Sequence, residues 1–285
     1  VKHGSLLGEA NCYKRIGDLR YQKSDLPAAA DMYQKALELY ASAGSVLGEA
    51  NAYKMKGEVA FSKNDMNAAG TGFETALGKY RKVKSAKGEA YCLMRLGDIA
   101  KKYDASKADS LYKEAAGLYR LSGSAPEEAE CVKKQADLAL ENSQYAKAEA
   151  LAQAALAISK KTGSPLATAK QIYGLAESTM KQGKLQKAED LYREAKFYFQ
   201  KEGKSVGEAN CFYKMGEIQY MKGNYGKADG YYSSALDLYR AAASVLGEAN
   251  CIAMKGDIRV KKSDYPGAGL LYRKALPLYE KSGSV

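Results

Sequence analysis

The most reactive side chains in this chain belong to five cysteines and one histidine. His3, the only histidine, lies at the very start of the chain, where we expect it to form no Cys-His or Ser-His pair, and it could supply a metal site with one histidine ligand only. No Walker-type glycine-rich loop and no dinucleotide-binding fingerprint is present. We therefore expect a protein that is not an enzyme and that holds no cofactor or metal ion.

The cysteines share one position in a repeated unit. Each lies two residues after a recurrent alanine, and the second unit has Ala52 at that position. Because the cysteines occupy one equivalent position in five repeats, they do not form a disulfide framework or a metal site. A small buried position that accepts either Cys or Ala explains why they recur. Free buried thiols favour a reducing compartment, and we expect a cytoplasmic protein. The cysteines are Cys12, Cys92, Cys131, Cys211 and Cys251.

Asparagine recurs with the same spacing, although it is a poor residue for a helix interior. Its amide carries a donor and an acceptor, so a column of asparagines could hold the backbone of an extended peptide. Tolerance of Asn in a first helical turn, or duplication of the repeats, explains the column equally well. The asparagines are Asn11, Asn51, Asn210 and Asn250.

An acidic residue recurs in all seven units. Such a column could receive Lys or Arg side chains of a ligand, or it could pair with cations of the protein itself. Three of the acids have a lysine four residues before them, each pair worth a few tenths of a kcal/mol on a helix. These pairs are Lys14–Asp18, Lys54–Glu58 and Lys133–Asp137, and the remaining acids are Asp98, Glu177, Glu217 and Asp257.

The elements that carry these residues are helices. Apolar residues between positions 10 and 19 follow the i, i+3, i+4 spacing of an amphipathic helix. Pro27 suits the first turn of a second helix, whose apolar residues lie between positions 29 and 40. Gly44 then serves as a left-handed C-terminal cap and Ser45 as the N-cap of the next helix. The sequence predicts an all-α protein.

A Gly-Glu-Ala-like anchor recurs every 39 or 40 residues, and such a period marks a solenoid in which each unit packs on its neighbours. Val1 is not a natural initiator, and residues 283–285 repeat residues 44–46, where another unit would begin. We therefore expect a fragment of a longer protein, with residues 1–285 forming one array. The predicted repeats span about 5–44, 45–84, 85–123, 124–163, 164–203, 204–243 and 244–283.

Two further patterns make the chain resemble the tetratricopeptide repeat (TPR) family. The eighth position of the first helix holds Gly or Ala in every unit, and the second helix reads Ala-aromatic-Ala in six units, as in Ala29-Tyr33-Ala36. A glycine inside a helix costs roughly 1 kcal/mol against Ala, so its recurrence predicts a close approach by the partner helix. The chain has no Trp, which is the family's usual residue at the fourth position. The 40-residue period resembles kinesin light chains, spindle-orientation adaptors and fungal or bacterial sensor arrays.

The resemblance implies a right-handed superhelical α-solenoid whose first helices line a concave groove that binds an extended peptide or a helical segment. It places three kinds of residue in the groove: the asparagines, the acids with two lysines, and several aromatic side chains. The acidic column would repel the C-terminal carboxylate that some family members bind, and would favour a ligand with basic side chains. The implied groove residues are Asn11, Asn51, Asn210, Asn250, Lys14, Lys54, Tyr213, Asp18, Glu58, Glu217, Asp257, Tyr21, Phe61 and Tyr220.

The net charge, the hydropathy and the chain ends bear on other classes of partner. The net charge is +11, but Lys and Arg are scattered among acids, so nucleic acid is not the favoured partner. No run of 18 apolar residues is present, so we expect no membrane insertion. The alternative function is a structural one: uncapped, matching ends would stack head to tail into a self-assembling array.

Overall fold

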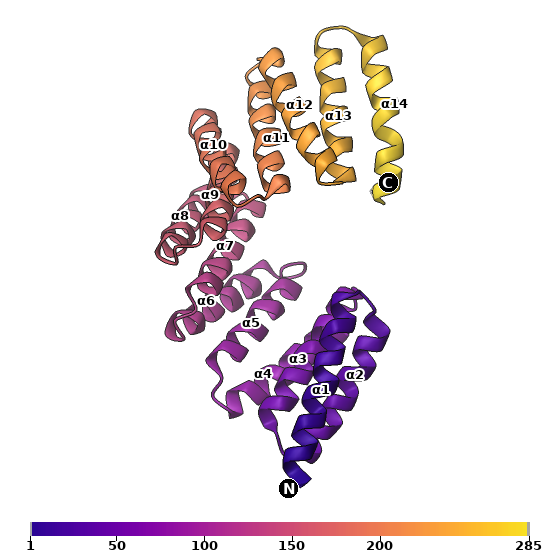
Figure 1. The fold of residues 1–285 in the computed structure, drawn as a ribbon. Coiled ribbons are helices and arrows are strands. Elements are labelled where there is room, and N and C mark those ends of the chain that lie inside the picture. The colour runs from indigo at the N-terminus through magenta and orange to yellow at the C-terminus, as the bar shows by residue number, and fades with distance from the viewer. Residues whose placement is uncertain (1, 284–285) are drawn as a thin grey trace. The chain divides into compact units, whose positions relative to one another are not determined.

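The computed structural model describes residues 2–283, with side chains from Leu6 onward. Fourteen α-helices make up these residues (Figure 1). Val1, Ser284 and Val285, on which part of the expectation of a longer protein rests, lie outside the described residues. The helices are α1 (Lys2–Gln22), α2 (Leu26–Ser42), α3 (Val46–Ser62), α4 (Met66–Lys82), α5 (Ala86–Ala100), α6 (Ala105–Leu121), α7 (Ala125–Glu141), α8 (Tyr145–Lys161), α9 (Pro165–Lys181), α10 (Leu185–Lys201), α11 (Ser205–Met221), α12 (Tyr225–Ala241), α13 (Val245–Lys261) and α14 (Tyr265–Ser282).

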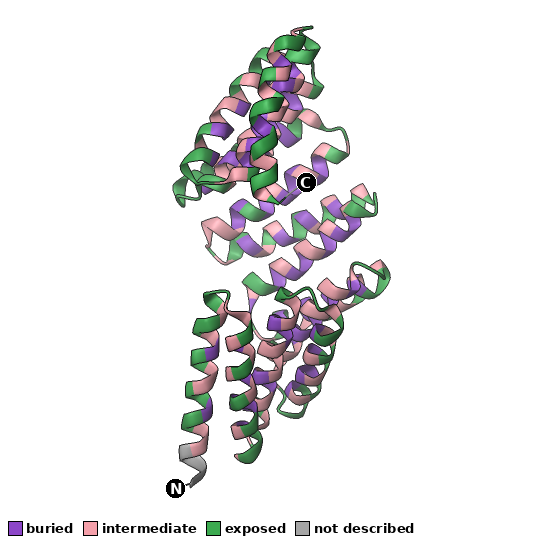
Figure 2. Cartoon of the chain, turned by 90° about the vertical axis from the view of Figure 1, so that its right-hand side faces the viewer, coloured by how far each residue is buried: buried purple, intermediate pink, exposed green. Residues whose placement is uncertain are grey.

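Consecutive helices pair into seven helix-turn-helix units, which confirms the predicted all-α solenoid of repeats. We call the odd-numbered helices the A helices and the even-numbered helices the B helices. Each helix carries a stripe of buried residues where it meets its neighbours and exposed residues elsewhere (Figure 2). The handedness of a superhelix stays a prediction of the resemblance.

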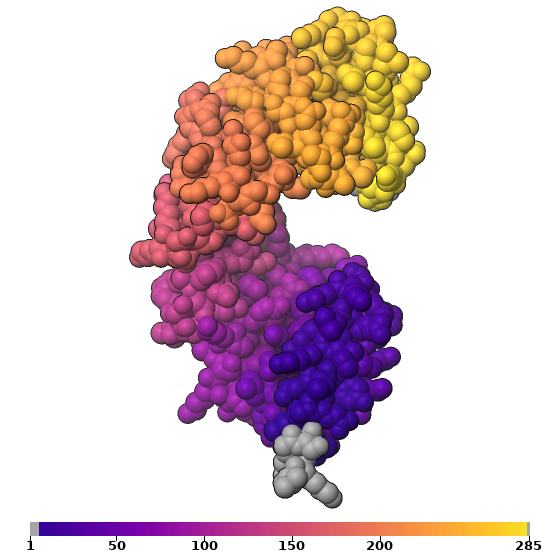
Figure 3. Space-filling view, in the orientation of Figure 1, coloured from indigo at the N-terminus to yellow at the C-terminus, as the bar shows by residue number. Residues whose placement is uncertain are grey.

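The chain divides into two compact units, Val1–Leu138 and Ala139–Val285, with the boundary inside α7. In the first unit, each helix from α1 to α6 packs against the next, and in the second unit the same holds from α8 to α14. In the space-filling view the colour runs in chain order along each unit (Figure 3). That both units belong to one continuous array stays a prediction of the repeat period.

Local residues determine where the helices begin and end. Gly44 has φ of +66°, in the left-handed region that was predicted for it. The Ser45 side chain accepts a hydrogen bond from the Gly48 backbone N–H at 3.2 Å and caps α3. Asp25 accepts from the Ala28 N–H at 3.3 Å at the start of α2, whose first turn holds Pro27. The predicted cap chemistry of this repeat is therefore confirmed.

The recurrent glycines admit aromatic rings, as the sequence predicts. A Cβ on Gly17 would lie 2.6 Å from Cε1 of Tyr33, the core tyrosine of the B helix in the same repeat. A second set works between repeats, since a Cβ on Gly48 would meet the ring of Tyr40 from the preceding B helix. Rings thus contact helix backbones both within a repeat and between repeats.

The predicted buried slot for the cysteines is confirmed at Cys92, Cys131, Cys211 and Cys251, which are all buried. Burial raises the pKa of the Cys92 thiol to about 12, so this sulfur stays protonated and unreactive at neutral pH. Cys12 is exposed, because no helix of the described residues packs on that side of α1. The slot prediction is therefore wrong for Cys12.

Candidate functional site on the A helices

All the predicted groove residues lie on four A helices, α1 and α3 in the first unit and α11 and α13 in the second. Asn11 is exposed, Glu58 is buried, and the others are half-buried. Each unit has a hollow on this side, and each hollow contains some of the predicted residues.

Every asparagine of the predicted column is bonded to a tyrosine of its own repeat, 29 residues later at the end of the B helix. In each pair the tyrosine hydroxyl donates to the asparagine Oδ1, while the asparagine Nδ2 has no hydrogen-bond partner among residues 2–283. The asparagines therefore link the A helix to the end of the B helix in each repeat, a role that neither sequence interpretation included. Their side-chain N–H groups remain available to a ligand. The O···O distances are 2.6 Å for Tyr40–Asn11, 2.7 Å for Tyr80–Asn51, 2.5 Å for Tyr239–Asn210 and 2.9 Å for Tyr279–Asn250.

The first hollow, of about 490 Å³, lies between α1 and α3. It brings together three predicted residues, Asn11, Lys14 and Asn51, beside the Tyr40 ring that inserts between the two helices. Arg15 also lines it and was not predicted. Its chemistry is that of amide donors and two cations.

Residues of the protein itself neutralise the acidic column of the first unit. Asp18 accepts from Lys14 at 2.7 Å and from the Tyr33 hydroxyl at 2.9 Å. The predicted Lys14–Asp18 pair is confirmed, and so is Lys133–Asp137 at 2.5 Å. Internal pairing, the second of the two sequence interpretations, therefore holds for these acids.

The predicted Lys54–Glu58 pair is wrong. Lys54 instead lies over the Tyr91 ring, 5.0 Å from its centroid. Burial is the main cause that lowers the pKa of Lys54 from its ordinary value. Glu58 instead accepts hydrogen bonds from the Tyr91 hydroxyl and from Arg95, residues of the following repeat that lie 33 and 37 positions further along the chain.

Arg95 is enclosed by two acids and two rings. Its Nε and Nη2 donate to the two oxygens of Glu58 at 2.8 and 2.9 Å, and its Nη1 donates to Asp98 at 2.8 Å. The guanidinium carbon lies 4.0 Å from the centroid of Phe61 and 5.7 Å from that of Phe73. A bidentate pair with a stacked ring is the arrangement that suits a guanidinium best. We call Glu58, Phe61, Phe73, Arg95 and Asp98 the arginine cage.

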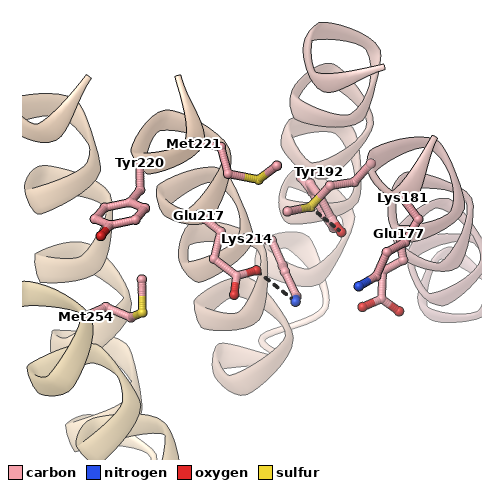
Figure 4. Close-up of a pocket in the computed structure, with 9 residues that line it drawn as sticks. Glu177, Lys181, Tyr192, Lys214, Glu217, Tyr220, Met221 and Met254 are labelled. Carbon is pink, nitrogen blue, oxygen red and sulfur yellow. Dashed lines mark hydrogen bonds and ion pairs between the residues drawn. The ribbon is translucent and has the colours of Figure 1, made fainter. Parts of the chain in front are cut away.

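The second hollow, of about 380 Å³, lies among α9, α10, α11 and α13 in the second unit (Figure 4). Thioether and aromatic groups line it together with two carboxylates and two ammonium groups. Glu217 pairs with Lys214 at 2.8 Å, and both side chains are about one quarter exposed. The lining residues are Glu177, Met180, Lys181, Tyr192, Lys214, Glu217, Tyr220, Met221 and Met254.

A buried hydroxyl beside this hollow has no partner. Tyr232 is fully buried, and its Oη lacks a hydrogen bond within the described residues. Tyr232 packs in one cluster with Tyr220 and Met254, which line the hollow. The corresponding tyrosines of the first and last repeats donate to the acid of their own repeat, Tyr33 to Asp18 and Tyr272 to Asp257.

The other predicted aromatic residues have mainly packing roles. Tyr213 tilts against Tyr232 with ring centroids 5.4 Å apart, and burial raises the pKa of Tyr213 above its ordinary value. The Tyr21 hydroxyl is 2.8 Å from the Ser62 hydroxyl of the next repeat.

Sequence reasoning missed Lys214 and the three methionines of the second hollow. The signal was available in the repeat alignment. Lys214 and Met254 stand at the position of Arg95, five residues after the anchor alanine.

Two findings bear on other kinds of site. No group of three or more His, Cys, Asp or Glu residues is arranged to hold a metal ion within the described part of the chain. Among residues 2–283, no helix is long and apolar enough to span a bilayer.

Paired helices, glycines under aromatic rings and Ala-aromatic-Ala second helices define a class of protein, the α-solenoids of helix-turn-helix repeats. A tetratricopeptide repeat family model matches residues 168–241. The fold of the chain is that of a tetratricopeptide-repeat-like solenoid. No curated protein matches its sequence.

Three solved structures have a similar fold. The apo form of RapI is 16% identical, with a TM-score of 0.73 over 97% of this chain and 100% of that one. A Rap protein complexed with competence and sporulation factor is 16% identical, with a TM-score of 0.66 over 97% and 76%. A signal transduction ATPase with a tetratricopeptide repeat sensor from Pyrococcus horikoshii is 13% identical, with a TM-score of 0.74 over 96% of this chain and 43% of that one.

Proposed function

We propose that this protein is an interaction scaffold that binds an extended or helical segment of a partner protein along its A helices. Tetratricopeptide repeat domains typically mediate binding between proteins, and a Rap protein of similar fold was crystallised with a factor that it binds. Cytoplasmic location and the absence of catalysis are parts of the same proposal.

The observation that carries the proposal is the second hollow. It combines Met180, Met221 and Met254 with Tyr220 and the charged groups of Glu217 and Lys214. Thioether side chains adapt to varied apolar partners, aromatic residues supply much of the energy of interfaces, and a few charged groups set orientation. The free amide N–H groups of the asparagine column add donors for a peptide backbone.

The test is a pull-down from nuclease-treated lysate with a variant that spares the tyrosine–asparagine bonds. Replacing Asn51→Asp and Asn210→Asp keeps an acceptor for Tyr80 and Tyr239 but removes the amide donors. We expect partner recovery to fall at least fivefold. Asn64→Asp, the same change in an exposed turn, is the control and should leave recovery unchanged. Equal recovery with the double variant would contradict backbone binding by the column.

A second candidate function is head-to-tail self-association. At internal junctions a tyrosine ring covers a glycine of the next A helix, as Tyr239 covers Gly247. Gly8 holds the equivalent position on α1, and no heavy atom of the described residues lies within 4 Å of where its Cβ would be. Leu276 on α14 is 55% exposed, whereas its counterpart Leu236 is 9% exposed. These two faces are complementary in the way that the internal junctions are.

Sedimentation velocity over a range of concentrations tests this candidate with the 285-residue chain. Self-association should appear as a sedimentation coefficient that rises with concentration. Leu276→Lys should abolish the rise, while Leu270→Lys, at a residue that is exposed on the same helix, should not. A chain that stays monomeric at all concentrations rules the candidate out.

A further inference from the structure

The arginine cage has a counterpart in the second unit. Five residues, each 159 positions further along the chain, occupy the same repeat positions. Both sites therefore have the same order of acid, aromatic, aromatic, central residue and acid. Residue by residue, Glu58 matches Glu217, Phe61 matches Tyr220, Phe73 matches Tyr232, Arg95 matches Met254 and Asp98 matches Asp257.

The counterpart lacks the cation that the cage holds. Met254 stands where Arg95 does, so no guanidinium of the following repeat reaches Glu217. The carboxylate is bonded instead by Lys214 of its own helix, three residues away, which is a pair of a kind that contributes little. Met254, Glu217 and Tyr220 all line the second hollow (Figure 4).

Two polar groups at the counterpart positions, Asp257 and Tyr232, also have fewer hydrogen-bond partners within the described residues than the cage would lead one to expect. Asp98 accepts from Tyr112 on one oxygen and from Arg95 on the other. Asp257 accepts from the Tyr272 hydroxyl at 2.6 Å, and its second oxygen has no partner among residues 2–283. Tyr232, in place of Phe73, adds a buried hydroxyl without a partner, and an unsatisfied buried polar group is costly. The second oxygen of Asp257 and the hydroxyl of Tyr232 could each accept a further hydrogen bond.

We propose that the second hollow binds an arginine side chain of the partner segment, with its guanidinium where the guanidinium of Arg95 lies in the cage. The guanidinium would displace Lys214, donate to Glu217 and lie against the ring of Tyr220. Its methylene groups would contact Met221 and Met254. This inference deepens the proposed function and rests on it, because it names the side chain that the scaffold recognises.

Arginine fits these groups better than lysine does. A planar guanidinium donates to both oxygens of a carboxylate and stacks on an aromatic ring at the same time, as Arg95 does on Glu58 and Phe61. An ammonium group is compact and strongly hydrated, and Lys214 already offers one to Glu217. The exchange of one ammonium for another would gain nothing.

The experiment is an NMR titration of protein labelled with ¹³C at the methionine methyl groups, with signals assigned by single Met→Leu substitutions. The probe is N-acetyl-arginine-methylamide. The controls are the citrulline analogue, which has the same shape without the charge, and the lysine analogue. We expect saturable shifts of the Met221 and Met254 methyls with the arginine probe, and a dissociation constant at least about tenfold weaker for both controls.

Three variants sharpen the test. Glu217→Gln should weaken the arginine probe about tenfold. Met254→Arg should place the chain's own guanidinium in the site, abolish binding of the probe and raise the melting temperature. Glu248→Gln, outside the hollow on α13, should change neither. Because Met254→Arg is expected to stabilise the fold, loss of binding in this variant cannot be blamed on unfolding.

The outcomes separate this inference from the proposed function. Equal shifts with arginine and citrulline, or unchanged affinity in Glu217→Gln, would overturn the arginine site. If the pull-down still recovers a partner in that case, the scaffold stands without it. Arginine binding that is lost in both Glu217→Gln and Met254→Arg supports the site even where the lysate yields no partner.

Discussion

At the scale of single residues, the length of the acidic side chain decides what the core tyrosine of each repeat bonds. Where the acid is Asp, the hydroxyl reaches it, as in Tyr33–Asp18, Tyr112–Asp98 and Tyr272–Asp257. Where the acid is Glu, it does not. Tyr192 donates to the Met180 sulfur at 3.9 Å, and Tyr232 has no partner in the described chain. We attribute this difference to the additional methylene of Glu, which moves the carboxylate further from the helix backbone than in Asp.

We therefore expect Glu217→Asp to stabilise the protein. The shorter carboxylate should accept from the Tyr232 hydroxyl and satisfy a buried group, which is worth about 1 kcal/mol in the free energy of unfolding. Urea denaturation measures the change. The same substitution made together with Tyr232→Phe should bring no gain, because the hydroxyl is then absent. A gain of equal size in that background would contradict the explanation.

At the scale of elements, junctions between repeats are held by polar contacts as well as by rings. Glu149 on α8 accepts from Lys184 and Lys187 at 2.9 and 2.8 Å and from Gln182 at 2.8 Å. These donors lie at the end of α9 and the start of α10. Hydrogen bonds from Lys184, Lys187 and Gln182 lower the pKa of Glu149 to about 2.

This lowered pKa predicts a pH-dependent junction. The folded state favours the ionised carboxylate, so its contribution to stability is present above the ordinary pKa of a glutamate and is lost as the pH falls towards 2. Glu149→Gln should therefore be less stable than wild type at pH 7, and the difference should shrink between about pH 5 and pH 2. Urea denaturation at several pH values measures it. Asp190→Asn, at an exposed pair with Arg193, is the control and should show little difference at any pH.

At the scale of the whole molecule, the chain consists of two compact units in which each repeat packs on its neighbours. In such an array, stability is close to a sum over repeats and their junctions. A defect at one junction should then loosen the repeats around it and leave distant repeats intact.

Gly48→Ala tests this locality. The new Cβ would meet the ring of Tyr40, and overpacking of this kind costs about 1–3 kcal/mol. We expect faster amide hydrogen exchange in α1 to α4 and unchanged exchange in α10 to α13, measured by mass spectrometry. Gly78→Ala, where a Cβ meets nothing within 4 Å, should leave exchange the same or slower. Faster exchange throughout both units would show that the molecule unfolds as one cooperative body.

The sequence by itself determined the period, the helices and the contacts that are repeated in every unit. Gly17 under the ring of Tyr33 has equivalents at Gly57, Gly97, Gly216 and Gly256, so one steric explanation applies to five of the repeats. Caps such as Ser45 depend on residues three positions away, and local interactions of this kind can be read from a single chain. These features predict the helix-turn-helix repeat, and the resemblance to the tetratricopeptide repeat family then implies a site on the A helices.

Only the tertiary structure decided which of the candidate side chains are already engaged. The oxygen of Asn51 is taken by Tyr80, 29 residues away, and Glu58 is taken by Arg95, 37 residues away, rather than by Lys54 on its own helix. Which of two partners binds such a group depends on how far each side chain extends across the junction between repeats, and these lengths differ by only a few ångströms. A repeat pattern gives the position of each residue on its helix, but it does not give the rotamer that the side chain adopts. For that reason the different partners of Glu58 and Glu217, which are Arg95 in the one case and Lys214 in the other, follow from the tertiary structure and not from the repeat pattern.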